Sequence, residues 1–462
     1  QRSTDFTLFA CVSKQRMKCY DRFLNRLAKS RTISPIRATD RFYGNDKLVY
    51  LAGGLPSSTA FPVTGIQFGL SNGNCITVSP EEVRAALQYG KTPGYTDLVI
   101  ELMKIQEKYH GIPKGHSLIV TAGCQDGLCK AIEAMMEFGD YVILEELTYS
   151  GFLSAVSPYD PKYLVVSGDE YGMNPKSLRA VLSRWDPKDV RSRSSGIPKI
   201  LYIVPNGYNS TGSCITLERK KEIYQIAQDY DLIILEDDPY FFLTYQDNLI
   251  PSFLSLDIDG RVIRCDSVSK IMSAGLRCGY LTGPDEMVSK IVLHMQASVF
   301  HASMLSQILL LNLLRNPACD SFQNMVDKAR RVYRERRDRA VKFAKNNLGS
   351  LVEFKIPESG IFLWIKVKGM QDTRNLVLER CPLKGVILVP GASFIPNKSG
   401  HSPYVRLSYA NATDEDLDRG TKLLAEAIIE DLASIPRQNG DLTSTPRQNG
   451  DLASDPRQNG DL

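Results

Sequence analysis

Short apolar runs alternate with amphipathic segments between residues 117 and 281, and no other feature of the chain constrains the fold as strongly. Residues 125–138 show the helical period, with Leu128, Ile132 and Met135 on one side, and residues 217–230 show it again. The strand-like runs cover residues 117–121, 141–144, 163–166, 200–204, 232–235, 262–263 and 276–281. Strands that alternate with helices form a mainly parallel sheet covered by helices on both faces, so we predict an α/β fold.

The C-terminal third of the chain predicts a second, smaller domain. Residues 320–347 have the pattern of a long polar helix, whose interleaved acids and bases indicate a solvated face rather than a nucleic-acid groove. Strands are expected at residues 363–367 and 385–389. An amphipathic helix at residues 421–432 then closes the domain.

A ten-residue repeat ends the chain, and its unit at residues 436–442 recurs at 446 and 456. Each unit offers a single leucine, too little apolar surface to offset the loss of chain entropy, so a disordered tail is expected. The prediction therefore has four regions, which are an N-terminal basic segment with an arm at 1–45, a large domain at 46–330, a small domain at 331–432 and the tail at 433–462.

Charge and cysteine patterns exclude several functional classes. The 56 basic and 52 acidic residues leave a net charge of +4, too small to indicate a nucleic-acid partner. None of the ten cysteines forms a Cys-x-x-Cys pair, so we expect no zinc site and no thioredoxin chemistry. No apolar run is long enough for a membrane span. The basic residues 14–31 suit a mitochondrial presequence or a surface helix, which leaves the mitochondrial matrix and the cytoplasm open as locations.

One short segment combines the groups that hold a phosphorylated aldehyde. Ser267, Ser269 and Lys270 are followed closely by Arg277. A lysine amine forms a Schiff base with the aldehyde of pyridoxal phosphate, while hydroxyl and guanidinium groups bind phosphate oxygens. For this segment alone a solvated lysine is the simpler interpretation. Ser-x-x-Lys also occurs in penicillin-binding enzymes, but this chain lacks their Ser-Asp-Asn and Lys-Thr-Gly elements.

Carboxylates follow the strand-like run at residues 232–235, where Asp237, Asp238 and Tyr240 occur. A carboxylate at the end of a buried strand is costly unless it is paired. Such a group could keep the ring nitrogen of the cofactor protonated, or it could form an ion pair or a helix cap. Alternation places Asp237 and Asp238 on opposite faces, and the spacing does not decide which of them faces a ring.

Three more positions suit the binding of anions or polar rings. The strand that ends at Thr121 opens a helix at Cys124 and Gln125, where free N–H groups bind phosphate, although an ordinary glycine turn has the same pattern. The loop at residues 205–212 carries Asn209, whose amide is able to reach a ring oxygen. Arg406 lies in an apolar strand and needs an anion, either a substrate carboxylate or a structural Asp or Glu.

Together these groups resemble those of the class I aminotransferases, pyridoxal-phosphate enzymes of fold type I, and more narrowly the kynurenine/α-aminoadipate aminotransferases of mitochondria. The resemblance covers residues 18 to 432 and implies a seven-stranded, mainly parallel sheet in the cofactor domain and a smaller α/β C-terminal domain. The segments that carry it are 34–37 (Ser-Pro-Ile-Arg), 51–56 (Leu-Ala-Gly-Gly-Leu-Pro), 86–89 (Ala-Leu-Gln-Tyr), 236–240 (Glu-Asp-Asp-Pro-Tyr), 266–270 (Asp-Ser-Val-Ser-Lys), 275–277 (Gly-Leu-Arg), 362–367 (Phe-Leu-Trp-Ile-Lys-Val) and 402–406 (Ser-Pro-Tyr-Val-Arg).

The resemblance implies a role for each matching residue. Lys270 would form the Schiff base and move the proton between substrate and cofactor. The other cofactor-binding residues would be Asp237 at the pyridine nitrogen, Tyr240 and Asn209 at the ring hydroxyl, Tyr149 stacked on the ring, and Ser267, Ser269, Arg277, Cys124 and Gln125 at the phosphate, with Tyr89 reaching the phosphate of the other subunit in a homodimer. The substrate-binding residues would be Arg406 at the α-carboxylate, Asn209, Phe362 in the pocket, and Arg37 and Gly54 in a mobile N-terminal segment.

The implied reaction is a ping-pong transamination between an L-amino acid such as kynurenine or 2-aminoadipate and a 2-oxo acid such as 2-oxoglutarate. Three departures from the family pattern, at Cys124, Leu147 and Ser210, are expected to weaken cofactor binding without abolishing the chemistry. The alternatives are a broad aromatic or branched-chain aminotransferase and a weakened paralogue that binds cofactor with little turnover. A DNA-binding regulator with this body is disfavoured, because only the residues before Ser34 would be left for its DNA-binding domain.

Overall fold

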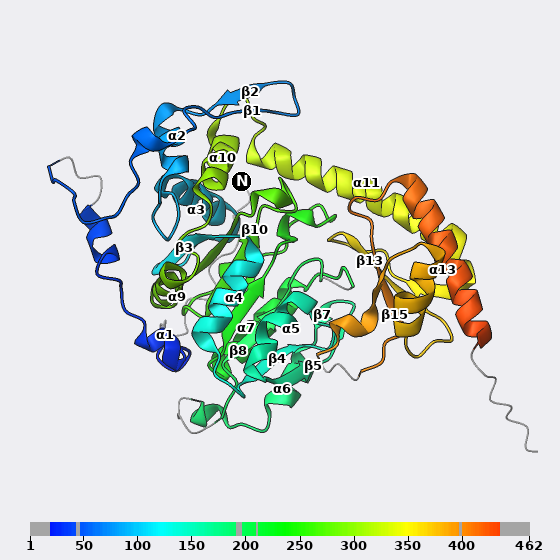
Figure 1. The fold of residues 1–462 in the computed structure, drawn as a ribbon. Coiled ribbons are helices and arrows are strands. Elements are labelled where there is room, and N and C mark those ends of the chain that lie inside the picture. Colours follow the sequence, from blue (N-terminus) through cyan, green and yellow to red (C-terminus); the bar gives the residue numbers. More distant parts are fainter. Residues whose placement is uncertain (1–18, 43–46, 191–195, 209–210, 397–399, 435–462) are drawn as a thin grey trace, which may run out of the picture.

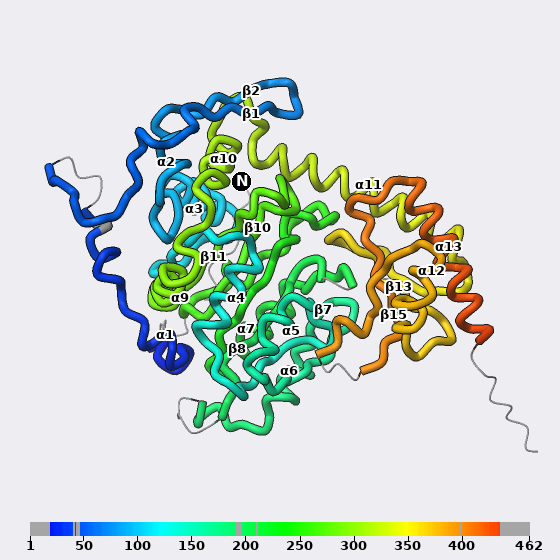
Figure 2. Tube along the Cα trace, viewed as in Figure 1, coloured from blue at the N-terminus to red at the C-terminus, as the bar shows by residue number. Residues whose placement is uncertain are grey.

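The computed structural model of the protein describes residues 19–42, 47–190, 196–208, 211–396 and 400–434. A seven-stranded sheet lies in the larger part and a four-stranded sheet in the smaller part, and the helix α11 (Phe322–Leu348) extends from one to the other (Figure 1). In the tube view this yellow helix leads directly into the orange segments of the smaller part (Figure 2). The domain boundary predicted between residues 330 and 331 falls inside α11 and stays a prediction.

The large sheet has the strand order β3-β11-β10-β9-β8-β4-β5. All neighbouring strands are parallel except β11, which is antiparallel to β3 and to β10. The strands are β3 (His116–Thr121), β11 (Gly279–Pro284), β10 (Val262–Ser267), β9 (Ile233–Asp237), β8 (Ile200–Ile203), β4 (Tyr141–Glu145) and β5 (Lys162–Val166). This arrangement confirms the mainly parallel α/β sheet that the alternation predicts.

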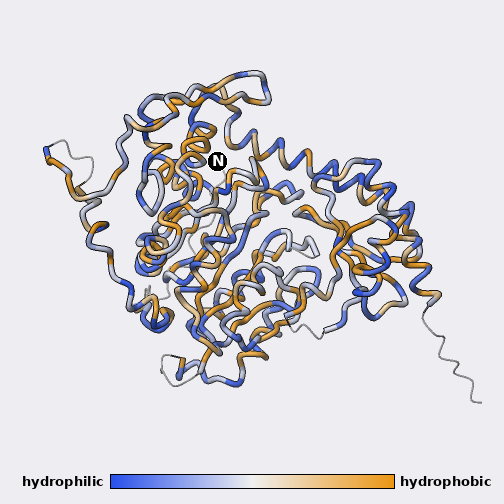
Figure 3. Tube along the Cα trace, in the orientation of Figure 1, coloured by the Kyte–Doolittle hydropathy of each residue, from blue (hydrophilic) through white to orange (hydrophobic). Residues whose placement is uncertain are grey.

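Successive residues of one strand pack on opposite faces of this sheet. In β4, Val142 and Leu144 belong to one apolar core, whereas Ile143 belongs to another. The helices of the first core are α4 (Cys124–Met135), α5 (Ser150–Val156) and α9 (Asp285–Ala297), and those of the second are α6 (Pro175–Leu182), α7 (Leu217–Asp229) and α8 (Phe253–Leu256). A sheet buried on both faces needs mainly apolar strands, and orange segments run through the middle of the larger part in the hydropathy view (Figure 3).

The helices of the large domain differ in how their first N–H groups are capped, and this difference affects the site. The Thr216 hydroxyl caps α7 by accepting from the N–H of Arg219 at 3.3 Å. Ser79 and Glu82 form a reciprocal capping box at α2 (Pro80–Leu87). The N-cap of α4 is instead Gly123, which has no side chain to cap the first N–H groups. The start of α4 is therefore suited to an external anion.

A second sheet with the order β12-β13-β15-β14 forms the smaller part, and all its neighbours are antiparallel. Its strands are β12 (Val352–Phe354), β13 (Phe362–Val367), β15 (Tyr404–Ser408) and β14 (Val389–Pro390). Leu363 and Val405 of this sheet share a core with Ala344 of α11 and Leu424 of α13 (Asp414–Ser434). The remaining elements include α3 (Thr96–His110), α10 (Met304–Arg315), α12 (Cys381–Lys384) and the hairpins β1 (Gln67–Gly69) with β2 (Cys75–Thr77) and β6 (Gly168–Asp169) with β7 (Gly172–Met173).

Two predicted strands need correction. The strand expected at residues 385–389 is wrong over most of its length, because Gly385 has a φ of 91° and ends α12, leaving only β14. The strand expected at 276–281 begins later, at Gly279, because Arg277 has a φ of 48° and turns the chain before β11. In both places a left-handed residue interrupts an apolar run that reads as one strand.

Part of the basic N-terminal segment belongs to the folded domain. Phe23 and Ala28 are buried in the same core as α4 and α9, next to the short helix α1 (Arg26–Ser30). The Tyr20 hydroxyl donates to the carbonyl of Gly260 at 2.7 Å. The repeat tail lies outside the described residues from residue 435 onward. Among the described helices, none combines the length and the apolar character that crossing a membrane requires.

Candidate active site

Lys270 lies in the turn that follows β10, the central strand beside β9. The N–H of Met272 closes this turn by donating to the carbonyl of Val268 at 2.9 Å. Burial lowers the pKa of the Lys270 amine, and the guanidinium groups of Arg277 and Arg406 lower that pKa further. An amine in such surroundings is more often unprotonated and is a better nucleophile than an exposed lysine.

Arg277 lies over the start of α4. Its Nη2 donates to the carbonyl of Ala122 at 3.0 Å. A Cβ at position 123 would lie 2.3 Å from that nitrogen, so the contact requires Gly123. The positive guanidinium and the positive end of the helix therefore face the same place. Nearby at the end of β10, the N–H of Ser269 donates to the Ser267 hydroxyl at 3.1 Å.

Gly279 of β11 keeps the two halves of this anion site close together. A Cβ at this position would lie 2.6 Å from the backbone nitrogen of Cys124 and 2.8 Å from the carbonyl oxygen of Asp266. Distances this short are not tolerated by real side chains, so a glycine is required. At Gly279, only the backbone of β11 therefore lies between the start of α4 and the end of β10.

Asp237 ends β9 and is almost fully buried. Its Oδ2 accepts a hydrogen bond from the Tyr202 hydroxyl at 2.8 Å, and its Oδ1 accepts one from the Cys124 thiol at 3.0 Å. Burial raises the pKa of this carboxyl, while the hydrogen bonds from Cys124 and Tyr202 and the charge of Arg264 oppose the rise. These donors favour the ionised form of Asp237.

Asp238 has a different, structural environment. Its Oδ2 accepts from Arg264 at 2.9 Å and from the Asn206 amide at 2.8 Å. Burial raises the pKa of Asp238 to about 6, although Arg264 opposes this rise. Arg264 also pairs with Glu236 at 3.1 Å and with Asp266 at 2.8 Å. The ion-pair interpretation thus applies to Asp238, and Asp237 is left to face the site.

Buried carboxylates outnumber buried cations around Asp237. The four buried carboxylates are those of Glu236, Asp237, Asp238 and Asp266, and the two buried cations are Arg264 and Lys220. Lys220 interacts electrostatically with Glu236 and Asp238, and its Nζ donates to the carbonyl of Pro251 at 2.8 Å. Unpaired buried charge is costly, so a further cation bound at Asp237 would be stabilised.

Two tyrosines lie between Asp237 and Arg406. Tyr240 follows β9 and is buried, and burial raises the pKa of its hydroxyl while Arg406 opposes the rise. Tyr149 is the N-cap of α5, and burial followed by the charge of Asp237 raises its pKa. Close by, the amide Nε2 of Gln125 donates to the carbonyl of Gly151 at 3.0 Å, so this side chain braces the first turn of α5.

Arg406 of β15 comes from the small sheet and lies on aromatic rings. Its guanidinium carbon is 4.0 Å from the centre of the Phe362 ring and 4.7 Å from that of Phe394. Burial lowers the pKa of Arg406, while the nearby Tyr240 and Tyr149 oppose this change. The rings fix the plane of the guanidinium, which is the geometry suited to a bidentate carboxylate.

The N-terminal arm and Tyr89 meet at a different edge of the site. The Arg37 guanidinium lies 3.6 Å from the ring centre of Phe300, and the Tyr89 ring packs edge-on against the same ring at 5.4 Å. A cleft of ≈ 570 Å³ is lined by Arg37, Gly54 and Tyr89, among others. Tyr89 is 54% exposed, whereas Asp237 and Tyr240 are buried.

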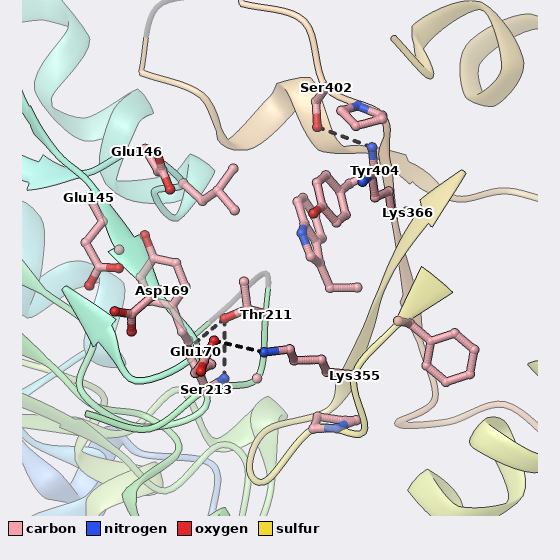
Figure 4. Close-up of a pocket in the computed structure, with 18 of the residues that line it drawn as sticks. Glu145, Glu146, Asp169, Glu170, Thr211, Ser213, Lys355, Lys366, Ser402 and Tyr404 are labelled. Carbon is pink, nitrogen blue, oxygen red and sulfur yellow. Dashed lines mark hydrogen bonds and ion pairs between the residues drawn. The ribbon is translucent and has the colours of Figure 1, made fainter. Parts of the chain in front are cut away.

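A cleft of ≈ 1080 Å³ lies between the two sheets and not at Lys270 (Figure 4). Glu145, Glu146 and Asp169 line one wall, and Lys366 and Tyr404 line the other (Figure 4). Burial raises the pKa of Glu145 to about 8. None of the described residues predicted for catalysis or for cofactor binding lines this cleft, so its size does not locate the chemistry.

The structure therefore brings most of the predicted residues together. Lys270, Arg277, Arg406, Asp237, Tyr149, Tyr240 and Cys124 are joined by the contacts and electrostatic interactions above. Asn209 and Ser210 lie outside the described residues. Leu147 packs against the core that contains α4 and α5. Among the described residues, no three metal-ligating side chains gather into a cluster.

Sequence reasoning missed Tyr202, Arg264 and Phe300. Tyr202 sits inside a strand-like apolar run, where an aromatic residue indicates core packing. Arg264 is the one charged residue within residues 262–265, and a charge there requires buried partners, a signal that was available. Phe300 has a φ of 70°, an unusual value for a bulky residue that no sequence pattern reveals.

Comparison with known proteins gives a consistent result. The family model described as aminotransferase class I and II matches residues 75–424. The mitochondrial kynurenine/alpha-aminoadipate aminotransferase of Mus musculus is 40% identical over 423 residues, covering 89% of this chain and 100% of that protein.

Solved structures agree on the fold. The crystal structure of aminotransferase Aro8 from Candida albicans has a TM-score of 0.79 and 26% identity, covering 91% of this chain and 99% of that chain. Pyrococcus horikoshii kynurenine aminotransferase, solved in complex with PMP, has a TM-score of 0.69 and 28% identity, covering 90% of this chain and 99% of that chain.

Proposed function

The chain belongs to the class I and II aminotransferase family, and we propose that it transfers the amino group of kynurenine, 2-aminoadipate or a similar L-amino acid to a 2-oxo acid such as 2-oxoglutarate. The observation that carries this proposal is the meeting of Lys270, Arg277 and Arg406, because both guanidinium groups act on the pKa of the lysine amine. The family implies pyridoxal 5′-phosphate as the cofactor.

The residues present fit this cofactor. Arg277 over the uncapped start of α4 suits a phosphate, and the excess of buried carboxylates around Asp237 suits a protonated ring nitrogen. When bound, pyridoxal phosphate supplies an electron sink for the charge that develops on the substrate carbon. We assign the phosphate to Arg277, Ser267, Ser269 and the N–H groups of Cys124 and Gln125, the ring to Tyr149, Tyr240 and Asn209, and the nitrogen to Asp237.

The remaining steps fall to this chain's own side chains. Lys270, with its lowered pKa, holds the cofactor and then takes and returns the proton of the substrate carbon. Arg406 binds the substrate α-carboxylate in the plane that Phe362 and Phe394 set. Tyr149 and Tyr240 flank this space and exclude water from the reacting carbon. Tyr202 and Cys124 donate to Asp237 and favour its ionised form.

Arg37, Gly54 and Phe362 are assigned to the side-chain pocket of the substrate. Arg37 would meet a distal carboxylate such as that of 2-aminoadipate, and Phe300 together with Phe362 would contact an aromatic ring such as that of kynurenine. A pocket with both features supports broad use of amino donors. The runner-up is therefore a general aromatic or branched-chain aminotransferase.

Two further features of the enzyme are proposed with it. Exposed Tyr89 would contact the phosphate of a second copy, so the working form would be a homodimer. The names of the mammalian relatives and the basic N-terminal segment support the mitochondrial matrix as the location, with the cytoplasm as the alternative.

A weakened enzyme is the second candidate function, and Cys124 favours it. The thiol donates to Asp237, so it is not placed to add a side-chain donor to a phosphate. The backbone N–H of Cys124 would then contact the phosphate without help from its own side chain. We expect this arrangement to lower cofactor affinity, so that less of the enzyme carries cofactor and overall turnover falls while the chemistry itself is kept.

Purified protein tests the proposal directly. Adding pyridoxal phosphate should produce visible absorbance that depends on Lys270, and Lys270→Ala should reduce turnover by about a thousandfold or more. Steady-state rates with kynurenine, 2-aminoadipate, methionine and leucine as donors then rank the substrates. Undiminished turnover of Lys270→Ala would refute the assignment, and absorbance without turnover of any donor would favour the weakened enzyme.

A further inference from the structure

The only polar group of the Tyr202 side chain is its hydroxyl, and this hydroxyl is bound to Asp237. The hydroxyl donates to Oδ2 at 2.8 Å, and both residues are buried. Tyr202 lies on β8 and Asp237 ends the neighbouring strand β9. The bond therefore connects two strands of the sheet at the edge where the cofactor is proposed to bind.

The Tyr202 ring is itself held in place. It stacks on the Phe152 ring of α5, with 3.6 Å between the ring centres and an angle of 10° between the ring planes. Tyr202 ranks among the largest fully buried side chains of the described residues. A phenol fixed by stacking and burial has little freedom to rotate, so the hydroxyl presents a donor at a constant position.

The other carboxylate oxygen of Asp237 is held separately. The Cys124 thiol at the start of α4 donates to Oδ1 at 3.0 Å. Two donors from different elements, one on each oxygen, fix the plane of the carboxylate and favour its ionised form. Each oxygen has a second lone pair, so both remain able to accept from a ring N–H.

We infer that Tyr202 is a positioning residue, which rests on the proposed function, and that it keeps the Asp237 carboxylate aimed at the protonated ring nitrogen of the cofactor. Tyr202 itself does not touch the reacting atoms. We predict that Tyr202 strengthens cofactor binding only when the bound ring carries a nitrogen. A residue that merely supports the fold would affect any bound ring equally.

The test measures cofactor binding without turnover. Dissociation constants are obtained by absorbance titration for pyridoxal phosphate and for its analogue with C–H in place of the ring nitrogen. Wild-type protein should bind pyridoxal phosphate more tightly than the analogue. In Tyr202→Phe this preference should shrink by about tenfold, because the lost hydrogen bond went to a charged group. Affinity for the analogue should not change, which also shows that the variant is folded.

Matched variants sharpen the result. Tyr163→Phe removes a phenol hydroxyl from β5, two strands beyond β8 in the sheet order, and should leave both constants unchanged. Cys124→Ala should reduce the preference by acting on the other oxygen, whereas Cys124→Ser keeps a donor and should retain it. An equal loss of affinity for both compounds in Tyr202→Phe, or an unchanged preference, would overturn the inference. A wild-type protein that binds neither compound would instead refute the proposed function.

Discussion

The two ends of the candidate site are built in opposite ways. At the ring-nitrogen end, Asp237 comes from the large sheet, is buried, and has a donor on each oxygen. At the substrate end, Arg406 comes from the small sheet and Arg37 from the N-terminal arm. The first end is fixed by the core of one domain, whereas the second depends on how separate parts of the molecule are arranged.

This difference predicts where each kind of mutation acts. Changes at the ring-nitrogen end should alter cofactor binding and the chemical step, because preorganised charge there acts on the transition state. Changes at the substrate end should mainly raise KM, because they remove binding that substrate and transition state share.

The largest expected effect is that of Asp237→Asn. The amide has nearly the same shape but no charge, so it no longer keeps the ring nitrogen protonated. We expect kcat to fall by about a hundredfold or more and the affinity for pyridoxal phosphate to fall as well. Steady-state kinetics and absorbance titration measure both quantities. A normal kcat in this variant would contradict the claim that the ring-nitrogen end of the site acts on the chemical step.

Asp238→Asn is the matched control for that variant. Asp238 accepts hydrogen bonds from Arg264 and from Asn206, and an uncharged amide weakens this pairing, so the free energy of unfolding should fall by about 2 kcal/mol while Glu236 and Asp266 still compensate the buried cation. The kcat of the protein that remains folded should change little. Urea denaturation measures the first effect, and active-site titration followed by kinetics measures the second.

The next effect in size is that of Arg406→Lys. Lysine keeps the positive charge but loses the planar fork that stacks on Phe362 and binds a carboxylate with two hydrogen bonds. We expect KM for amino donors to rise about tenfold with a much smaller change in kcat. Rates over a range of donor concentrations separate the two constants. A fall in kcat with unchanged KM would place Arg406 with the chemical step instead.

Tyr89 tests whether the cofactor phosphate needs a residue from a second copy. Lys270→Ala and Tyr89→Ala are each expected to be impaired as homodimers. In a mixed dimer of these variants, one site would combine an intact Lys270 with an intact Tyr89 from the other copy. Co-expression in equal amounts should then recover up to about a quarter of wild-type activity, since half of the dimers carry one complete site. No recovery beyond the average of the two variants would show that Tyr89 serves its own subunit.

The same contrast separates what the sequence could reveal from what it could not. Lys270 and the pair Asp237 and Asp238 are predictable as one cluster because they follow apolar strands, and parallel strands place such positions at one edge of a sheet, although the spacing alone does not choose between the two carboxylates. Tyr202 is not predictable, since a tyrosine inside a strand gives the same sequence pattern whether its ring only packs in the core or its hydroxyl also donates a hydrogen bond. Arg406 was expected to need an anion, and the sequence did not reveal that its guanidinium also packs on the rings of Phe362 and Phe394. These contacts join residues far apart in the chain, and no local pattern records them.

The smallest expected effect concerns Glu145, which lies away from both ends. Burial raises its pKa to about 8, so the folded protein holds this carboxyl protonated at neutral pH, while the unfolded chain releases the proton above its ordinary pKa of about 4.3. Unfolding therefore releases a proton at any pH between the unfolded and the folded pKa of Glu145. The stability present at low pH is lost as the pH rises towards 8, with a slope of at most about 1.4 kcal/mol per pH unit.

Glu145→Gln should remove this part of the pH dependence. The amide cannot ionise and has nearly the same volume, so the variant should lose less stability than wild type between pH 6 and pH 8, with a difference of about 2 kcal/mol. Urea denaturation at both pH values measures it, and Glu146→Gln in the same cleft is the control. Turnover should change little, because Glu145 lines the cleft between the sheets rather than the surroundings of Lys270. Equal pH dependence of stability in wild type and variant would mean that Glu145 is already ionised in the folded protein. Water would then have to reach its carboxylate from the cleft.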